Sequence, residues 1–139
     1  MAAINYFSQD ISFTFSNRRK VSAWIKKAIR TEGKVLTELN FIFCSDEYLL
    51  KINTKFLNHK TYTDIITFDN SDRGAEIAGD IFISVERVKE NALKLKIPFS
   101  DELHRVVIHG VLHLIGYSDK TARQKKEMRK KEDAYLSLR

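Results

Sequence analysis

Apolar and polar positions alternate along the chain with two different periods, and each period predicts a type of element. In residues 21–29 apolar side chains recur every three or four positions, which places them on one face of a helix. In residues 35–44 they recur at every second position, as in a strand. Residues 63–70 and 76–84 also have the composition of strands, and the turn-rich NSDRG between them predicts an antiparallel hairpin.

The other segments complete a predicted order of strands and helices. Residues 3–8 and 11–15 alternate like an edge strand or a hairpin. The helix expected at 101–115 is apolar on nearly all sides, which predicts a buried, central position. We therefore expect an α+β fold, in which a small mixed β-sheet with a β-hairpin is covered by about five helices. The remaining helices are predicted over residues 46–56, 85–96 and 120–137, and the N-caps of the helices starting near 46, 85 and 101 are predicted at Ser45, Ser84 and Ser100.

Length and composition limit the class of protein. The chain has 139 residues, 43% of them hydrophobic, and is expected to form a single domain over residues 1–139. Its apolar runs are too short to span a bilayer, and its start, MAAINYFSQD, lacks the basic and apolar regions of a signal peptide. Cys44 is the only cysteine, which excludes an internal disulfide and a zinc–thiolate cluster. We therefore expect a cytoplasmic protein without membrane contact.

The net charge of +6 is unevenly distributed. From Lys120 to Lys131 the chain is strongly basic, with Glu127 as the one acidic residue of that segment. Such a stripe attracts polyanions, which makes nucleic acid a candidate partner. A solvated helix face explains the same charges, so the basic residues alone do not decide between the two interpretations.

The segment HGVLHLIGYSD carries the strongest chemical signal. His109 and His113 are four residues apart, so both imidazoles lie on one face of the predicted central helix, and Arg105 lies on that face one turn earlier. This spacing is a known way to bind zinc through imidazole nitrogen. Two separate, hydrogen-bonded histidines are the alternative, but two buried imidazoles cost several kcal/mol without partners, and a shared metal ion provides one for both.

A third ligand is expected just after the helix. Gly116 can take the left-handed conformation that ends a helix and reverses the chain, and Asp119 follows three residues later. The spacing matches that of the zinc-protease motif H-E-x-x-H-x-x-G-x-x-H, with aspartate as the third ligand. Asp119 is alternatively an N-cap of the last helix. Gly110 stands where the motif has its catalytic glutamate, which argues against a protease and indicates close packing of the helix or close approach of a backbone.

At these residues the sequence resembles the YbeY family of bacterial metal-dependent endoribonucleases, which mature ribosomal RNA. The family signature H-G-x-L-H-L-x-G-Y-D-H matches residues 109–117, and Asp119 stands in place of the usual third histidine. Residues 63–68 (TDIITF) and 78–84 (AGDIFIS) are similar to two further family segments, so the resemblance covers about residues 53–119. Leu57 stands at a position where the family usually has an arginine. That arginine is thought to serve the RNA substrate.

The resemblance implies a fold, a metal and a reaction. It implies a zincin-like fold with the metal site on the central buried helix, and one divalent ion, expected to be Zn²⁺, held by His109, His113 and Asp119. A carboxylate in the third position makes manganese or iron more tolerable than an all-histidine site does. The implied activity is single-strand-specific cleavage of RNA, in 3′-end maturation of small-subunit ribosomal RNA and in ribosome quality control. The implied partners are ribosomal RNA and the small ribosomal subunit, with no DNA.

Several roles remain open at this stage. Arg105 either stabilises charge on the phosphate or pairs with Asp101 or Glu102. Lys55, His59 and Lys60 lie near Leu57 and are candidates to replace the family arginine, although an exposed loop histidine is the simpler interpretation of His59. Two other functions compete with the nuclease: a ribosome-assembly factor with a structural metal, and a zinc hydrolase of another class, such as a peptidase or amidase. A domain with two core histidines and no metal is the plainest alternative.

Overall fold

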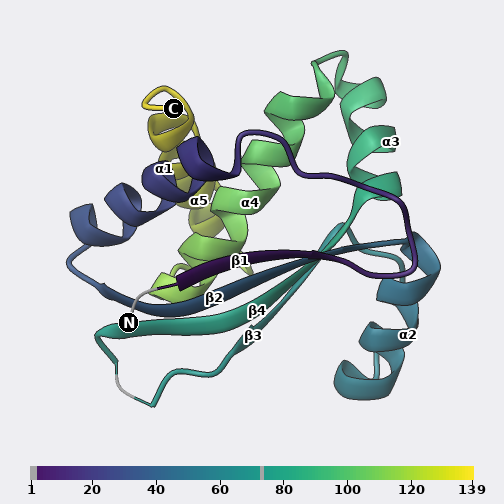
Figure 1. Ribbon diagram of the computed structural model, residues 1–139, viewed down its shortest axis with the longest axis horizontal. Helices are drawn as coiled ribbons and strands as arrows, with labels where there is room; N and C mark the ends of the chain where they lie inside the picture. The colour runs from purple at the N-terminus through teal and green to yellow at the C-terminus, as the bar shows by residue number, and fades with distance from the viewer. Residues whose placement is uncertain (1–2, 73) are drawn as a thin grey trace.

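A computed structural model describes residues 3–72 and 74–139; the first two residues and Arg73, which belongs to the predicted turn, lie outside the described residues. Over these ranges the helices and strands follow one another in the predicted order (Figure 1). The elements are β1 (Ala3–Ser8), α1 (Arg18–Thr31), β2 (Val35–Cys44), α2 (Asp46–Leu57), β3 (Ile65–Asp69), β4 (Glu76–Ser84), α3 (Val85–Leu95), α4 (Phe99–Ile115) and α5 (Ala122–Leu136).

The strands of the described residues form a mixed sheet with the order β1-β2-β4-β3. β1 pairs with β2 and β2 with β4 in parallel, whereas β3 and β4 pair in antiparallel fashion. The predicted hairpin is therefore confirmed, and so is the α+β class with its mixed sheet and helical cover. Because β3 is the edge strand next to α4, one side of its backbone is available at the sheet margin.

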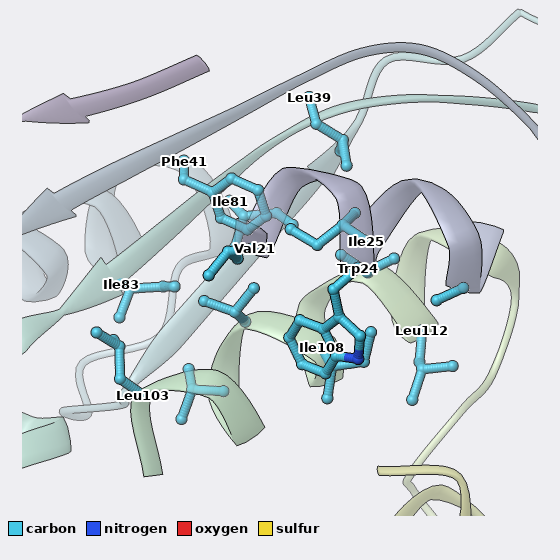
Figure 2. Packing of buried hydrophobic residues seen from close by; sticks show 14 of the residues in the cluster. Val21, Trp24, Ile25, Leu39, Phe41, Ile81, Ile83, Leu103, Ile108 and Leu112 are labelled. Carbon is cyan, nitrogen blue, oxygen red and sulfur yellow. The ribbon is translucent and has the colours of Figure 1, made fainter. Parts of the chain in front are cut away.

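The main core lies between the sheet and the helices α1 and α4, and α5 packs against α4 (Figure 1). The alternation of β2 sends Leu39, Phe41 and Phe43 into this core. Each large apolar side chain buried in this way contributes about 1.5–3 kcal/mol. Figure 2 shows how the core residues of the two helices meet those of the strands: Val21, Trp24 and Ile25 of α1, Leu103, Ile108 and Leu112 of α4, and Leu39, Phe41, Ile81 and Ile83 of the sheet.

A smaller apolar cluster lies on the opposite face of the sheet, under α2. Leu49 of α2 packs there with Cys44 and Ile66. Cys44 is fully buried, as its strand position predicted, and burial raises the pKa of its thiol to about 12. No helix in the described ranges has the length and apolar content needed to cross a membrane.

Two local predictions were wrong. Residues 11–15 form a loop and not a strand, because the alternating Phe13 and Phe15 pack their rings against Phe43 while the backbone leaves the sheet. Ser100 is the second residue of α4 and not its N-cap. Pro98 precedes the helix, and its carbonyl accepts the amide hydrogens of residues 101 and 102, so the first turn closes without a side-chain cap.

Candidate metal centre

Two histidines and an aspartate converge at the C-terminal end of α4. His109 and His113 lie one turn apart on the same face of that helix. Gly116 ends the helix with a φ of 127°, in the left-handed range that favours glycine. The chain reverses there and brings Asp119 beside the two imidazoles, as the spacing predicted. Asp119 is not the N-cap of α5, because Thr121 fills that position with a capping box.

The ligand-type atoms of this cluster face one another across short distances. The Nε2 atoms of His109 and His113 are 3.0 Å apart, and Oδ2 of Asp119 lies 3.4 Å from each of them. Ligands arranged tetrahedrally at about 2.0–2.1 Å from a zinc ion are about 3.3–3.4 Å from one another. The cluster thus has nearly the dimensions of a tetrahedral site with three protein ligands and one open position.

A buried carboxylate orients the first imidazole. Oε2 of Glu132, on α5, lies 2.6 Å from Nδ1 of His109, and Glu132 is only 4% exposed. Burial alone would raise the pKa of Glu132, but hydrogen bonds from His109 and Arg105 outweigh it and hold that pKa below its usual value. An ionised Glu132 accepts the Nδ1 hydrogen, which leaves the lone pair of Nε2 directed toward the cluster.

The second imidazole is oriented by the backbone. Nδ1 of His113 lies 3.0 Å from the carbonyl oxygen of Tyr117. A carbonyl only accepts, so the hydrogen of His113 is on Nδ1 and its Nε2 also presents a lone pair. The two Nε2 lone pairs and the Asp119 carboxylate then face one another. These electron-rich groups repel one another unless a cation lies between them. The chemistry of the donor set therefore fits a divalent metal ion.

Arg105 acts on this arrangement from one turn away. Its Nη1 donates to Oε1 of Glu132 (3.0 Å) and its Nη2 to Oδ1 of Asp133 (2.8 Å). These partners are not the two acidic residues that the sequence suggested, because the fold places α5 against this face of α4, and Asp101 pairs with Arg139 instead.

A second network supports the chain reversal. The Tyr117 hydroxyl donates to Oε1 of Glu32 (2.6 Å), and Lys131 donates to Oε2 (3.2 Å), which also accepts from the Tyr135 hydroxyl. Glu32 caps the C-terminal end of α1, so this carboxylate joins α1, the loop after α4, and α5. The contact with Glu32 thus fixes Tyr117, whose backbone carbonyl orients His113.

Sequence reasoning missed both supporting carboxylates. Glu132 lies on the inner stripe of the last helix, between Met128 and Tyr135, and an acidic residue on the apolar side of a basic helix is a signal that was available. Glu32 carried no local signal, because its partners are 85 to 103 residues away in the sequence.

Cavities flank the cluster on both sides. One, of about 390 Å³, lies between α4 and α5; the other, of about 410 Å³, lies between the segment after α2 and the edge strand β3. Both cavities reach His109 and Asp119, and both are lined by Asp64. Burial raises the pKa of the Asp64 carboxyl, and the charge of His109 offsets this shift only in part. Leu57 and the exposed loop residue His59 both line the second cavity.

Gly110 is explained by packing. A Cβ atom added there would lie 2.8 Å from Cδ1 of Ile65 and 3.1 Å from two atoms of Ile81. The helix therefore approaches the sheet too closely for a side chain at this position, which confirms the tight packing that the sequence suggested. A glutamate like that of the zinc proteases does not fit here.

A histidine pair on a buried helix, a carboxylate that follows a glycine turn, and two adjoining cavities form an arrangement on this α+β scaffold that is typical of metal-dependent hydrolases. Comparison with known families is in accord with this class. The sequence model of the family described as Endoribonuclease YbeY matches residues 3–138, and the chain belongs to this family.

Relatives with this description cover nearly the whole chain. The Endoribonuclease YbeY of Cytophaga hutchinsonii is 52% identical over 136 residues, which are 98% of this chain and 95% of the relative. That of Karelsulcia muelleri is 53% identical over 133 residues, which are 96% of this chain and 93% of the relative. Among solved structures, the solution structure of a Thermotoga maritima protein is similar, with a TM-score of 0.67 and 26% identity over 97% of this chain and 87% of that one.

These findings confirm the resemblance seen in the sequence. The family consists of endoribonucleases, which are hydrolases acting on the phosphodiester bonds of RNA, and the chain has the family's fold class and a cluster able to hold a divalent metal.

Proposed function

We propose that this chain is a metal-dependent endoribonuclease that cuts single-stranded RNA during maturation of the 3′ end of small-subunit ribosomal RNA and in ribosome quality control. We place it in the cytoplasm, acting as one domain over residues 1–139, with the small ribosomal subunit and its RNA as partners. The observation that carries the proposal is the convergence of His109, His113 and Asp119, with the Nε2 atoms of both histidines facing one another, in a member of an endoribonuclease family.

These three residues would hold one divalent ion, for which Zn²⁺ is the expected metal. When bound, such an ion supplies Lewis acidity toward a phosphoryl oxygen and lowers the pKa of an attacking water. The chain itself contributes orientation: Glu132 and the carbonyl of Tyr117 fix the imidazoles, and Arg105 holds Glu132 in place. We therefore assign Arg105 to positioning of the site through Glu132, in preference to direct contact with phosphate.

The surroundings of the site suit an extended polyanion. The edge strand β3 borders the cavities on both sides of the cluster, and the exposed basic residues of α5 lie next to one of them. Lysine and arginine side chains guide RNA by charge, so affinity is expected to fall as salt concentration rises. A peptidase is disfavoured because the position of the protease glutamate is Gly110, where a Cβ has no room.

Cleavage by the purified protein tests the proposal. The protein is stripped with a chelator, reloaded with Zn²⁺ or Mn²⁺, and incubated with unstructured RNA and with casein. We expect RNA cleavage that depends on metal, and a loss of at least about 100-fold in His113→Ala with RNA affinity retained. His104→Ala, on the same helix but away from the cluster, is the matched control.

Each rival predicts a different result. A peptidase would digest casein and spare RNA. An assembly factor with a structural metal would bind the small subunit and cut nothing. Equal metal content in the wild type and Asp119→Ala, measured by elemental analysis, would show that Asp119 is not a ligand.

A further inference from the structure

The cavity between α4 and α5 extends well beyond the metal-capable cluster. It begins at His109 and Asp119 and ends at Glu102, seven residues earlier on the same face of α4. Seven residues are two helical turns, or about 10.5 Å along the helix. This length is comparable with the reach of one nucleotide from its phosphate to the Watson–Crick edge of its base.

Glu102 lines this cavity at the end away from the metal-capable cluster, and one of its carboxylate oxygens has no hydrogen-bond partner among the described residues. The residue is 5% exposed, and the oxygen concerned is Oε1. Burial and the charges of Asp64 and Glu132 raise the pKa of its carboxyl, and the charges of Arg105 and Arg129 offset this shift only in part. A buried acceptor left unpaired costs about 1–3 kcal/mol, so its persistence beside a cavity indicates a ligand that donates hydrogen bonds.

The walls and the rim of the cavity differ in chemistry. Ile65 and the buried Val106 and Met128 give the apolar part of the walls, between the helices and β3. The walls also have a polar part, which is supplied by Asp64, Arg105 and Glu132. Lys125 and Arg129 stand exposed on α5 at the rim. Apolar patches in the walls, a cationic rim and a carboxylate at the end away from the cluster suit a ligand with a flat ring, an anionic group and N–H donors at the far edge of the ring.

We propose that this cavity is a base-binding subsite for the nucleotide next to the scissile phosphate, and that it selects guanine. The inference rests on the proposed function and adds to it the base that the enzyme prefers. Guanine offers N1–H and N2–H side by side, and the two oxygens of the Glu102 carboxylate can accept both. The Oε1 atom is buried in the free protein, and the last torsion of a glutamate is broad, so the carboxylate turns to present both oxygens when guanine binds.

The other bases fit this carboxylate less well. When Glu102 is ionised, adenine and cytosine each place a ring-nitrogen acceptor, beside their amino group, opposite its second oxygen. Uracil places its single N–H between two carbonyl groups. Each alternative leaves an oxygen of Glu102 opposite another acceptor, which is repulsive in a buried site.

Binding of the four nucleoside monophosphates to the full chain tests the subsite. We expect calorimetry with GMP, AMP, CMP and UMP to show that the affinity for GMP is at least about tenfold higher than the affinity for each of the others. Glu102→Gln keeps the shape but removes one acceptor, and is expected to abolish this preference. Glu127→Gln, an exposed carboxylate on α5, should retain it. Thermal melting confirms that each variant is folded.

The rim residues have a separate expected effect. Lys125→Ala and Arg129→Ala should weaken the binding of all four nucleotides to a similar extent, because the lysine and arginine side chains would contact the phosphate and not the base. Their neighbours Lys126 and Lys130, which are also exposed but do not line the cavity, give control variants with affinity near that of the wild type.

The outcomes separate this inference from the proposed function. Equal affinity for the four nucleotides, or a GMP preference that survives in Glu102→Gln, overturns the subsite. RNA cleavage without guanine beside the cut sites would overturn it too, while leaving the nuclease standing. A GMP preference that Glu102→Gln abolishes, in a protein that cuts no RNA, supports the subsite and refutes the nuclease.

Discussion

The two imidazoles of the cluster are held by different kinds of acceptor. His109 has the carboxylate of Glu132 and His113 has a backbone carbonyl. A carboxylate makes the stronger hydrogen bond and also increases the basicity of the ring it orients. His109 is therefore the ligand whose properties depend most on a single side chain, and Glu132 is the residue through which the site is most easily altered without removing a ligand.

Glu132→Gln tests this dependence. We expect a loss of about 10–100-fold in Zn²⁺ affinity, since the amide keeps the shape but replaces an ionised acceptor by a neutral one. Competition with a chromophoric chelator measures the affinity. Asp133→Asn, which alters the other carboxylate bound by Arg105, is the control. Unchanged affinity in Glu132→Gln would contradict the positioning role.

At the scale of elements, the site depends on how closely α4 and β3 approach β4. Gly110 lets α4 descend onto the sheet, and Gly79 of β4 sits against the backbone oxygen of Phe68 and the side chain of Leu114. The ends of β3 and α4 that border the cluster are thus set by two positions without side chains. The histidine face lies beside the edge strand because of this close packing.

Gly79→Ala is expected to destabilise the protein by about 1–3 kcal/mol, because its Cβ would lie 2.5 Å from a backbone atom that cannot move alone. Urea unfolding measures the change. Gly74→Ala, whose Cβ would meet nothing within 4 Å, should be close to neutral. A Gly79→Ala variant as stable as Gly74→Ala would show that the contact relaxes without cost.

At the scale of the whole molecule, Glu32 joins segments that are far apart in the sequence. Burial alone raises its pKa, but hydrogen bonds from Tyr117, Tyr135 and Lys131 outweigh it, so the pKa lies below its ordinary value of 4.5. A carboxyl with a depressed pKa in the folded state stabilises the fold at pH values above its unfolded pKa. That contribution is lost as pH falls through the folded pKa.

Glu32→Gln is therefore expected to lower the free energy of unfolding by about 1–3 kcal/mol at neutral pH. The difference from the wild type should shrink as pH falls from about 4.5, the ordinary pKa of this carboxyl, through its lower pKa in the folded state. Chemical denaturation at a series of pH values measures it, with Glu127→Gln as the exposed control. A difference that stays constant from neutral to acid pH would refute the charge-based role.

The sequence by itself determined the features that arise from local geometry. The i, i+4 spacing of His109 and His113, the helix end at Gly116 and the return of Asp119 all follow from a few consecutive residues, and each was predicted. The hairpin and the buried central helix followed from periodicity for the same reason.

The tertiary structure alone decided which side chains support and surround the cluster. Glu132 is 23 residues from His109 and Glu32 is 85 residues from Tyr117, and only packing of the helices brings them together. It also turned residues 11–15 into a loop, gave Arg105 its partners and placed Glu102 at the end of a cavity. Periodicity reports which face of an element is buried; it does not report which distant residue that face meets, because that depends on the docking of whole elements.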